Sequence, residues 1–270
     1  MRAAGMEKQV VFSDIDGTLL NRQGKITPKT QEAIRILQSK GVPFVLVSAR
    51  SPSGIYPILH EYGFSCPIIS YSGGLILDES RQVLFHKGLP KPLARKIISV
   101  IESSGLDLAW CVYSLDQWLV KDRRDPRIAQ EEAIVRATAQ EGSVDSAQHD
   151  QISKILCIGS PKSILAAEAQ LKRAFPRCSI VRSADFLLEV MEQGVTKAAA
   201  AKTLCSLWNI PVAQTLAFGD HYNDEDLLQA VGAGFLMGNA PAELKKRLPR
   251  HTKDNDHDGI YWGLFTQGLI

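Results

Sequence analysis

Polar side chains come directly after short apolar runs at three places in this sequence. Such runs are typical of buried strands in a parallel sheet, and ligands bind at the carboxyl ends of these strands. The residues concerned are Asp14, Asp16 and Gly17 after residues 10–13, Ser48 after residues 42–47, and Asp220, Asn223 and Asp224 after residues 215–218. If the three strands are neighbours, the carboxylates of Asp14, Asp16, Asp220 and Asp224 converge.

Several carboxylates can converge only if their charge is balanced. Two like charges about 4 Å apart repel by roughly 4 kcal/mol at an effective dielectric constant near 20, so four together require protonation or a cation. The candidate ligands are oxygen atoms, and His221 beside them is not assigned to a metal. Oxygen sites with few protein ligands suit Mg²⁺, which also binds substrate phosphate. We therefore expect a magnesium site.

This arrangement of residue types suits the hydrolysis of a phosphate ester. Phosphate monoesters hydrolyse extremely slowly without a catalyst, and a carboxylate nucleophile divides the reaction into two easier displacements. Asp14 would attack phosphorus, and Asp16 could protonate the leaving alcohol and then deprotonate water. Ser48 can donate a hydrogen bond to a phosphate oxygen, and a nearby lysine would neutralise the charge of the transition state.

Strand and helix signals alternate at both ends of the chain. Thr27-Pro28 is typical of a helix start, and Gly41 can end that helix. Helical and apolar segments alternate again after Gly194, as far as residue 248. The expected fold is α/β, with a Rossmann-like parallel sheet that helices cover on both faces. This core is predicted to contain residues 1–88 and 193–270.

The middle of the sequence has a different pattern. Hairpins mixed with helices favour an antiparallel sheet with helices on one face. The predicted helices are residues 91–104, 126–141 and 164–175, and the predicted strands are residues 108–113, 117–122, 154–158, 179–182 and 186–191. Residues 89–192 are therefore predicted to form an inserted α+β domain, which we call the cap.

Composition limits the partners and the compartment. The 270 residues carry a formal net charge of +2, which gives no electrostatic argument for a nucleic-acid or membrane partner. No run approaches the roughly 18 apolar residues of a membrane span, and the N-terminus lacks the apolar stretch of a signal peptide. The five cysteines have no CxxC spacing. We expect a soluble, cytoplasmic protein with reduced cysteines; the sequence does not indicate its oligomeric state.

The polar clusters resemble the four motifs of the haloacid dehalogenase (HAD) superfamily phosphatases. Residues 14–20, DIDGTLL, are similar to the DxDGTLL nucleophile motif, and Ser48 stands at the second motif. Lys197, in Gly-Val-Thr-Lys, resembles the third-motif lysine, and residues 219–224 resemble the metal-binding fourth motif. An inserted domain between the second and third motifs is similar to the Cof-like sugar-phosphate phosphatase subgroup. Residues 237–240 and 258–260 also resemble that subgroup.

The resemblance implies a role for each motif residue. Asp14 would be the nucleophile and Asp16 the acid and base. Mg²⁺ would be held by Asp14, the backbone carbonyl of Asp16 and Asp220, with Asp224 acting through water or behind the ligands. Gly17, Ser48, Lys197 and Asn223 would position the phosphoryl group of a small sugar or polyol phosphate. The subgroup commonly has Asn at the position of Ser72. This difference concerns a contact with the substrate and not the core chemistry.

The same residues also allow other interpretations. Asp16-Gly17 alone is typical of a turn, and Lys197 could be a solvated lysine, although the helix dipole opposes a cation at a helix N-terminus. Residues 254–259 match the first half of a calcium-binding loop, but its twelfth position is Phe265 where a Glu is needed. A phosphotransferase or mutase with the same nucleophile, or a catalytically silent sugar-phosphate sensor, are the alternative functions.

Overall fold

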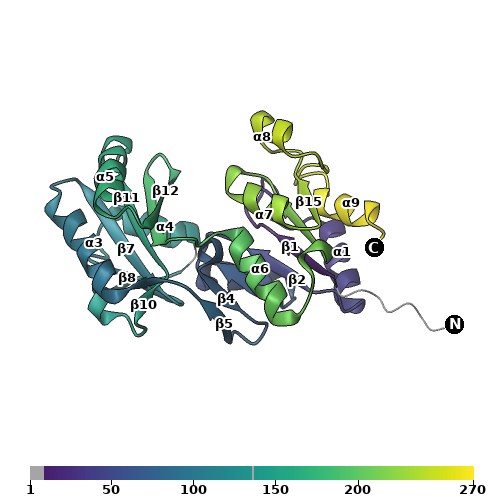
Figure 1. Cartoon of the computed structure of the whole chain (residues 1–270), viewed down its shortest axis with the longest axis horizontal. Coiled ribbons are helices and arrows are strands. Elements are labelled where there is room, and N and C mark those ends of the chain that lie inside the picture. The colour runs from purple at the N-terminus through teal and green to yellow at the C-terminus, as the bar shows by residue number, and fades with distance from the viewer. Residues whose placement is uncertain (1–8, 136) are drawn as a thin grey trace. The chain divides into compact units, whose positions relative to one another are not determined.

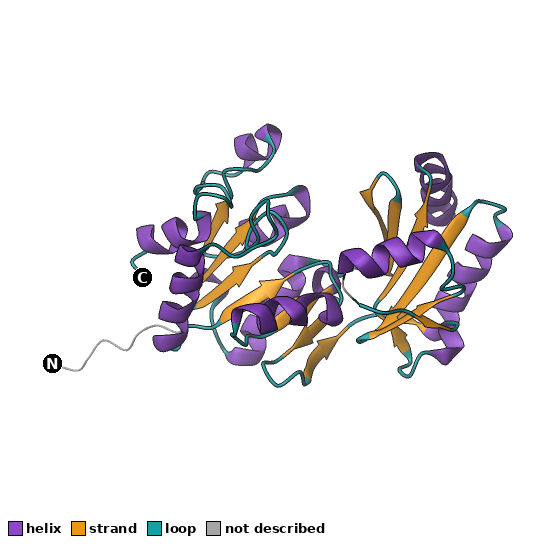
Figure 2. Cartoon of the chain, turned by 180° about the vertical axis from the view of Figure 1, so that it is seen from behind, coloured by secondary structure: helices purple, strands orange, loops and turns teal. Residues whose placement is uncertain are grey.

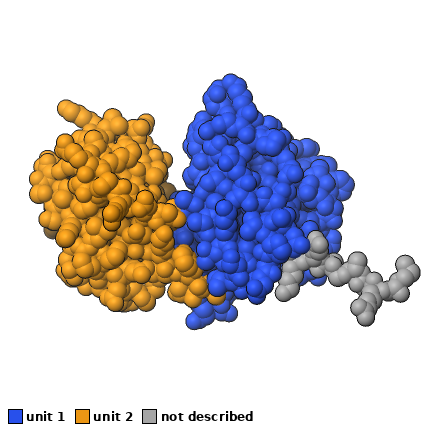
Figure 3. Space-filling view, in the orientation of Figure 1, with its two compact units in different colours: residues 1–49, 59–82, 196–270 blue, residues 50–58, 83–195 orange. Residues whose placement is uncertain are grey.

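The chain forms two compact units in a computed structural model that describes residues 9–135 and 137–270. Unit 1 contains the described residues up to Ala49 together with Leu59–Gln82 and Thr196–Ile270, and unit 2 contains Arg50–Ile58 and Val83–Val195 (Figure 3). Each unit is built on its own sheet. The predicted domain limits, residues 1–88 with 193–270 and residues 89–192, stay a prediction.

Unit 1 is built on a mainly parallel sheet (Figure 1). The strands of this sheet that belong to unit 1 follow the order β15 (Ala233–Leu236), β14 (Thr215–Gly219), β1 (Val10–Ser13), β2 (Phe44–Val47), β3 (Ile68–Ser70) and β4 (Leu75–Leu77). All these pairs are parallel except that of β3 with β4. All four residues of β1 are buried, because a strand in the middle of a parallel sheet is covered on both faces. The predicted α/β class is confirmed.

Two helices of unit 1 begin at a threonine side chain that caps them. Thr27 Oγ1 accepts the N–H of Thr30 at the start of α1 (Pro28–Ser39), and Thr196 Oγ1 accepts the N–H of Ala199 at the start of α6 (Lys197–Trp208). The other helices that belong wholly to unit 1 are α7 (Glu225–Ala230), α8 (Ala242–Arg247) and α9 (Gly259–Thr266), whereas α2 (Pro52–Tyr62) is divided between the two units after Ile58. Helix α1 packs beside α9, and α6 packs beside α7.

Unit 2 combines a mixed sheet with helices (Figure 2). The sheet order is β12 (Cys178–Ala184), β13 (Leu187–Glu192), β11 (Lys154–Gly159), β7 (Leu108–Ser114), β8 (Gln117–Val120) and β9 (Gln140–Glu141), while β6 (Leu89–Pro90) pairs with β10 (Gln151–Ile152). The helices are α3 (Lys91–Ser103), α4 (Pro126–Val135) and α5 (Pro161–Ala174), and β5 (Val83–His86) precedes them. The predicted α+β class of this segment is confirmed.

The apolar core of unit 2 joins one sheet face to two helices. Ile97 of α3 and Ile164 of α5 belong to the same buried cluster as Trp110, Val112 and Ile155 of the sheet. Alternate residues of β7 point to the two faces of the sheet. Trp110 is thus a packing residue of the unit 2 core.

One predicted helix of unit 2 was too long. Helix α4 ends at Val135, whereas the sequence predicted a helix over residues 126–141. Gln140–Glu141 instead form β9, which pairs in parallel with β8, and residue 136 lies outside the described residues. The Ala-rich composition favours a helix, but here pairing with a sheet edge determines the structure.

Two expectations from composition can be compared with the structure. No helix within residues 9–135 or 137–270 is both long and apolar enough to cross a membrane. All five cysteines are free thiols, and four of them are buried. The cysteines are thus placed as small apolar residues of the cores.

The turn between β3 and β4 has a left-handed backbone at two consecutive non-glycine residues. Tyr71 has a φ of 52° and Ser72 a φ of 54°, a region that costs roughly 1–2 kcal/mol for most residues but that Asn adopts more readily. We expect Ser72→Asn to raise the free energy of unfolding by about 0.5–1 kcal/mol in urea denaturation. Ser72→Ala is the control without this gain. A Ser72→Asn variant less stable than wild type would contradict the backbone argument.

A half-buried histidine gives unit 2 a pH-dependent stability. Ser153 Oγ accepts the N–H of Leu115 (3.2 Å) and lies within hydrogen-bond distance, 2.9 Å, of His86 Nε2. Burial lowers the pKa of His86 to about 4, with His149 adding to the effect. The unfolded chain, with a pKa near 6.5, therefore takes up the proton first as the pH falls.

We accordingly expect the stability of unit 2 to decrease as the pH falls from about 6.5 towards 4. The free energy of unfolding should drop by about 1 kcal/mol between about pH 7 and pH 5, after allowance for the partial exposure of the ring. The His86→Gln variant keeps a side chain that can hydrogen-bond to Ser153 but that cannot titrate. Its free energy of unfolding, measured by urea denaturation, should therefore lose this part of the pH dependence. The same slope in both proteins would rule out His86 as its source.

Candidate active site

Strand β1 lies between β14 and β2, so the loops after all three strands begin at one edge of the sheet. Ser13 is in register with Phe218, and the N–H of Asp14 donates to the carbonyl of Phe218 (3.0 Å). The parallel pairing of β1 and β14 therefore places the loop that begins at Asp14 beside the loop that begins at Asp220. Ser48 follows β2 at the same edge.

Three of the predicted carboxylates come together. Asp14, Asp220 and Asp224 each offer an oxygen, and these oxygens lie within 4.8 Å of one another. Asp14 and Asp224 are buried, at 6% and 0% exposure, whereas Asp220 is half-buried. The sequence predicted this convergence from strand ends alone.

Lys197 lies between two of these carboxylates. Its ammonium group donates to Asp14 Oδ1 (2.6 Å) and to Asp224 Oδ1 (2.5 Å), and the side chain is 1% exposed. Burial alone would lower the pKa of Lys197, but the two carboxylates raise it above its ordinary value. Lys197 is the first residue of α6, where the helix dipole disfavours a cation. The two carboxylates offset this cost.

Asp224 has both carboxylate oxygens in hydrogen bonds. Oδ1 accepts from Lys197, and Oδ2 accepts the backbone N–H groups of Asp220 and His221, both at 3.0 Å. Asp224 thus holds the lysine and shapes the turn that carries Asp220. This arrangement is consistent with the predicted role of Asp224 through water or behind the metal ligands, and that role stays a prediction.

The Asp220 carboxylate is held from two sides. Thr18 Oγ1 donates to Oδ1 (3.1 Å), and Asn239 Nδ2 donates to Oδ2 (3.2 Å). Gly17, with a φ of +82°, lies so close that a Cβ there would overlap the Asp220 carboxylate. Burial and the nearby Asp224 raise the pKa of Asp220 to about 6, although the Thr18 hydrogen bond opposes this.

The charges and donor atoms of this cluster fit a divalent cation. Burial raises the pKa of Asp14 to about 8; Lys197 opposes this increase, and Asp224 and Asp16 add to it. Three carboxylates face one lysine, so a bound cation would balance the remaining negative charge. The side chains of this cluster offer carboxylate oxygens, a ligand type that Mg²⁺ prefers. Asp14 and Asp220, with the predicted backbone carbonyl of Asp16, could hold the ion.

The remaining predicted residues lie on the same loops. The Asp16 side chain is exposed, in contrast to that of Asp14, as an acid that must reach a leaving group requires. Ser48 is 2% exposed, and its backbone bonds to Ile69 and Ser72. Asn223 is exposed in the short 3₁₀ helix Tyr222–Asp224. Their roles towards a phosphoryl group stay predictions.

Two residues of the cluster were not predicted as site residues. Thr18 lies within the nucleophile motif, and its place two residues after Asp16 was the signal that could have indicated its role. Asn239 lies in a segment singled out for its family likeness, but no chemical role was assigned to it. Both donate to the Asp220 carboxylate.

Comparison with known families decides the superfamily. The profile of the haloacid dehalogenase-like hydrolases matches residues 11–264. The chain belongs to this family. Over 255 residues, this HAD-like hydrolase is 33% identical to a putative phosphatase of Haemophilus influenzae, with 94% of the chain and 96% of the relative covered. It is 28% identical over 243 residues to an HMP-PP phosphatase of Yersinia pseudotuberculosis, with 88% and 86% covered.

Solved structures agree with this assignment. A haloacid dehalogenase-like hydrolase from Bacteroides thetaiotaomicron superposes with a TM-score of 0.87 at 25% identity, covering 97% of this chain and 100% of the other. A sugar phosphatase of HAD subclass IIB has the same fold, with a TM-score of 0.81 at 21% identity and the same coverage. This HAD-like hydrolase is a phosphatase with a subclass IIB type of cap.

Proposed function

We propose that this phosphatase hydrolyses small sugar or polyol phosphates through an aspartyl-phosphate formed on Asp14, with Mg²⁺ as cofactor. The observation that carries the proposal is the buried Asp14 carboxylate, which receives a hydrogen bond from the equally buried Lys197 next to Asp220 and Asp224. A buried carboxylate is costly unless it is paired. This cost is consistent with a function in the reaction.

In the first step, an oxygen of Asp14 attacks phosphorus and the bond between phosphorus and the ester oxygen breaks. Asp16 gives its proton to the departing oxygen. Lys197 aligns Asp14 and favours its ionised form, because the ammonium group opposes the effect of burial on the Asp14 pKa. When bound, Mg²⁺ would neutralise negative charge on the phosphoryl oxygens.

In the second step, water attacks phosphorus and the bond between phosphorus and Asp14 breaks. Asp16, now a carboxylate, takes the proton of the attacking water, so inorganic phosphate leaves and both aspartates return to their initial states. A phosphoryl acceptor other than water would make the protein a phosphotransferase.

The relatives support a small phosphorylated metabolite as substrate. One relative is named HMP-PP phosphatase and one solved neighbour is a sugar phosphatase. We expect the purified protein to hydrolyse para-nitrophenyl phosphate, and members of a panel of sugar and polyol phosphates, only when Mg²⁺ is present. Absence of turnover on this compound and on the whole panel at saturating Mg²⁺ would favour the sensor function instead.

A change at Asp16 tests its proposed role as acid. We expect Asp16→Ala to lower kcat/KM for an alkyl phosphate by about 10²–10⁴-fold, because an alkoxide leaves poorly without a proton. Nitrophenolate leaves well by itself, so kcat/KM for para-nitrophenyl phosphate should fall much less. The two esters are compared by kcat/KM because this parameter reports only on the first step. The second step also uses Asp16 but does not contribute to kcat/KM. Equal losses for both esters would count against the acid role.

A further inference from the structure

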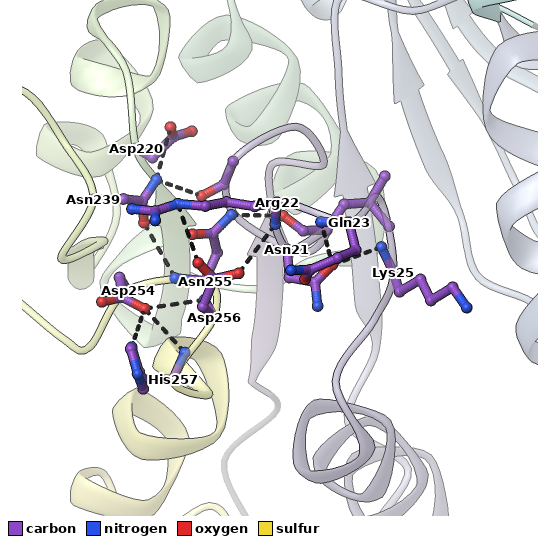
Figure 4. Close-up of polar contacts among 12 residues, drawn as sticks. Asn21, Arg22, Gln23, Lys25, Asp220, Asn239, Asp254, Asn255, Asp256 and His257 are labelled. Carbon is purple, nitrogen blue, oxygen red and sulfur yellow. Dashed lines mark hydrogen bonds and ion pairs between the residues drawn. The ribbon is translucent and has the colours of Figure 1, made fainter.

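The loop that carries the nucleophile Asp14 is held by two other loops, both of which are distant from it in the sequence. One loop, residues 237–240, follows β15, and the other, residues 253–258, precedes α9. Their contact with each other includes a hydrogen bond from the N–H of Gly238 to the carbonyl of Lys253 (3.1 Å). Figure 4 shows Asn239 and Asn255 from these two loops between Asp220 and the turn of residues 21–25.

The side-chain amide of Asn239 connects three elements. Its Nδ2 donates to the carbonyl of Gly17 (2.8 Å) and to Asp220 Oδ2 (3.2 Å). Its Oδ1 accepts the backbone N–H of Asn255 (3.2 Å). Because a backbone N–H can only donate, this third bond fixes which end of the amide faces Asp220. Asn239 therefore presents a donor, and not an acceptor, to the carboxylate.

Asn255 continues this chain of hydrogen bonds back to the nucleophile loop. Its Nδ2 donates to the carbonyl of Leu20 (2.8 Å), and its side chain is 7% exposed. The path from Asp220 through Asn239 and Asn255 ends on the same loop that carries Gly17. A closed path of hydrogen bonds, here partly buried, restricts the rotation of every member.

The bonds to Asp220 leave it prepared to bind a cation. Oδ1 is held by Thr18 and Oδ2 by Asn239, so the plane of the carboxylate is fixed. Each carboxylate oxygen has two lone pairs, and one hydrogen bond to each oxygen leaves acceptor capacity for a metal ion. Partners of this kind orient metal ligands and typically change metal affinity by about 10–100-fold when removed.

We propose that Asn239 is a positioning residue that orients the Asp220 carboxylate for the divalent cation, with Asn255 fixing the direction of its amide. The inference rests on the proposed function, because it assigns the cation to Asp220. It adds a determinant of metal affinity that lies outside the four motifs.

The experiment measures metal binding directly, without a phosphate ester. The probe is Mn²⁺, whose free concentration is followed by electron paramagnetic resonance during titration of the full-length protein. Asn239→Leu keeps the approximate shape of the side chain but removes both polar atoms. Asn239→Ala, which leaves room for water, is the second variant in case leucine prevents folding. Lys245→Met is the matched control, because Lys245 anchors the same loop through the Gly238 carbonyl but does not contact Asp220.

We expect the Kd for Mn²⁺ to rise at least about 10-fold in both Asn239 variants and to stay within about twofold of wild type in Lys245→Met. The Mg²⁺ concentration for half-maximal turnover should rise in parallel, with a smaller change in kcat at saturating Mg²⁺. The Asn239 variants and the Lys245→Met control can all have a lower Tm than wild type. Asn239 variants with this lower Tm but with the Mn²⁺ affinity of wild type would overturn the proposal.

Failure of this inference can be distinguished from failure of the proposed function. Weakened Mn²⁺ binding in the Asn239 variants, in a protein that hydrolyses no phosphate ester, would support the inference and contradict the function. Wild-type Mn²⁺ affinity in the variants of an active, Mg²⁺-dependent enzyme would overturn the inference alone. A wild-type protein that binds no Mn²⁺ would overturn both.

Discussion

Lys197→Met is expected to lower the free energy of unfolding of unit 1 by about 3–5 kcal/mol and to abolish turnover. The ammonium group of Lys197 donates to Asp14 and Asp224, and all three side chains are buried. Removing one partner of a buried ion pair leaves an uncompensated charge, which is among the most destabilising of single changes. Urea denaturation and a phosphatase assay measure the two effects.

A double variant separates charge from packing in this prediction. Asp224→Asn keeps a carbonyl oxygen for the N–H groups of Asp220 and His221 but removes one of the carboxylates that Lys197 pairs. We therefore expect Lys197→Met with Asp224→Asn to be more stable than Lys197→Met alone. If the double variant is as unstable as the sum of the single changes, the loss comes from packing instead of from unpaired charge.

The second large effect is expected for Asp14→Asn, which should lower kcat by at least about 10⁴-fold while the protein stays folded. The amide cannot form the proposed acyl phosphate, and loss of a nucleophile typically costs a factor of this size or larger. The Asn carbonyl oxygen can still accept from Lys197 at the same position. Its thermal unfolding should therefore remain cooperative, close to that of wild type.

A chemical trap tests the intermediate itself. Acid quenching of the wild-type enzyme during turnover, followed by borohydride reduction, should convert an acyl phosphate at residue 14 into homoserine, which peptide mass spectrometry detects. Asp14→Asn is the matched negative control. Homoserine at another aspartate, or wild-type-like turnover in the variant, would exclude Asp14 as the nucleophile.

The sequence predicted the elements of unit 1 that carry the site. Residues 10–13 and 215–218 are apolar runs followed by carboxylates, and their parallel pairing makes Asp14 and Asp220 neighbours. Such runs are informative because a strand covered on both faces has apolar residues in succession, and not alternating apolar and polar residues. The α/β class and the position of the inserted α+β segment followed from the same patterns.

Other parts of the site could not be predicted because they depend on tertiary contacts. No sequence pattern indicated that Lys197 and Asp224 pair, since one begins a helix and the other ends a short 3₁₀ helix, and they meet only in the folded unit. Asparagine is common in loops for local reasons, so nothing in residue type marked Asn239 as a partner of Asp220. Helix α9 was also missed, because its apolar residues do not show a one-sided helical period.

The order of the pieces of unit 1 has a consequence for biosynthesis. Thr18 and Asp220 are hydrogen-bonded although they are 202 positions apart along the chain, and β1 completes its pairing only when β14 has been made. A ribosome therefore releases the whole of unit 2 before the carboxylates can assemble, and closure of so long a loop makes this a late folding event. Nascent chains arrested before residue 220 should consequently be devoid of phosphatase activity, however well their inserted unit is folded.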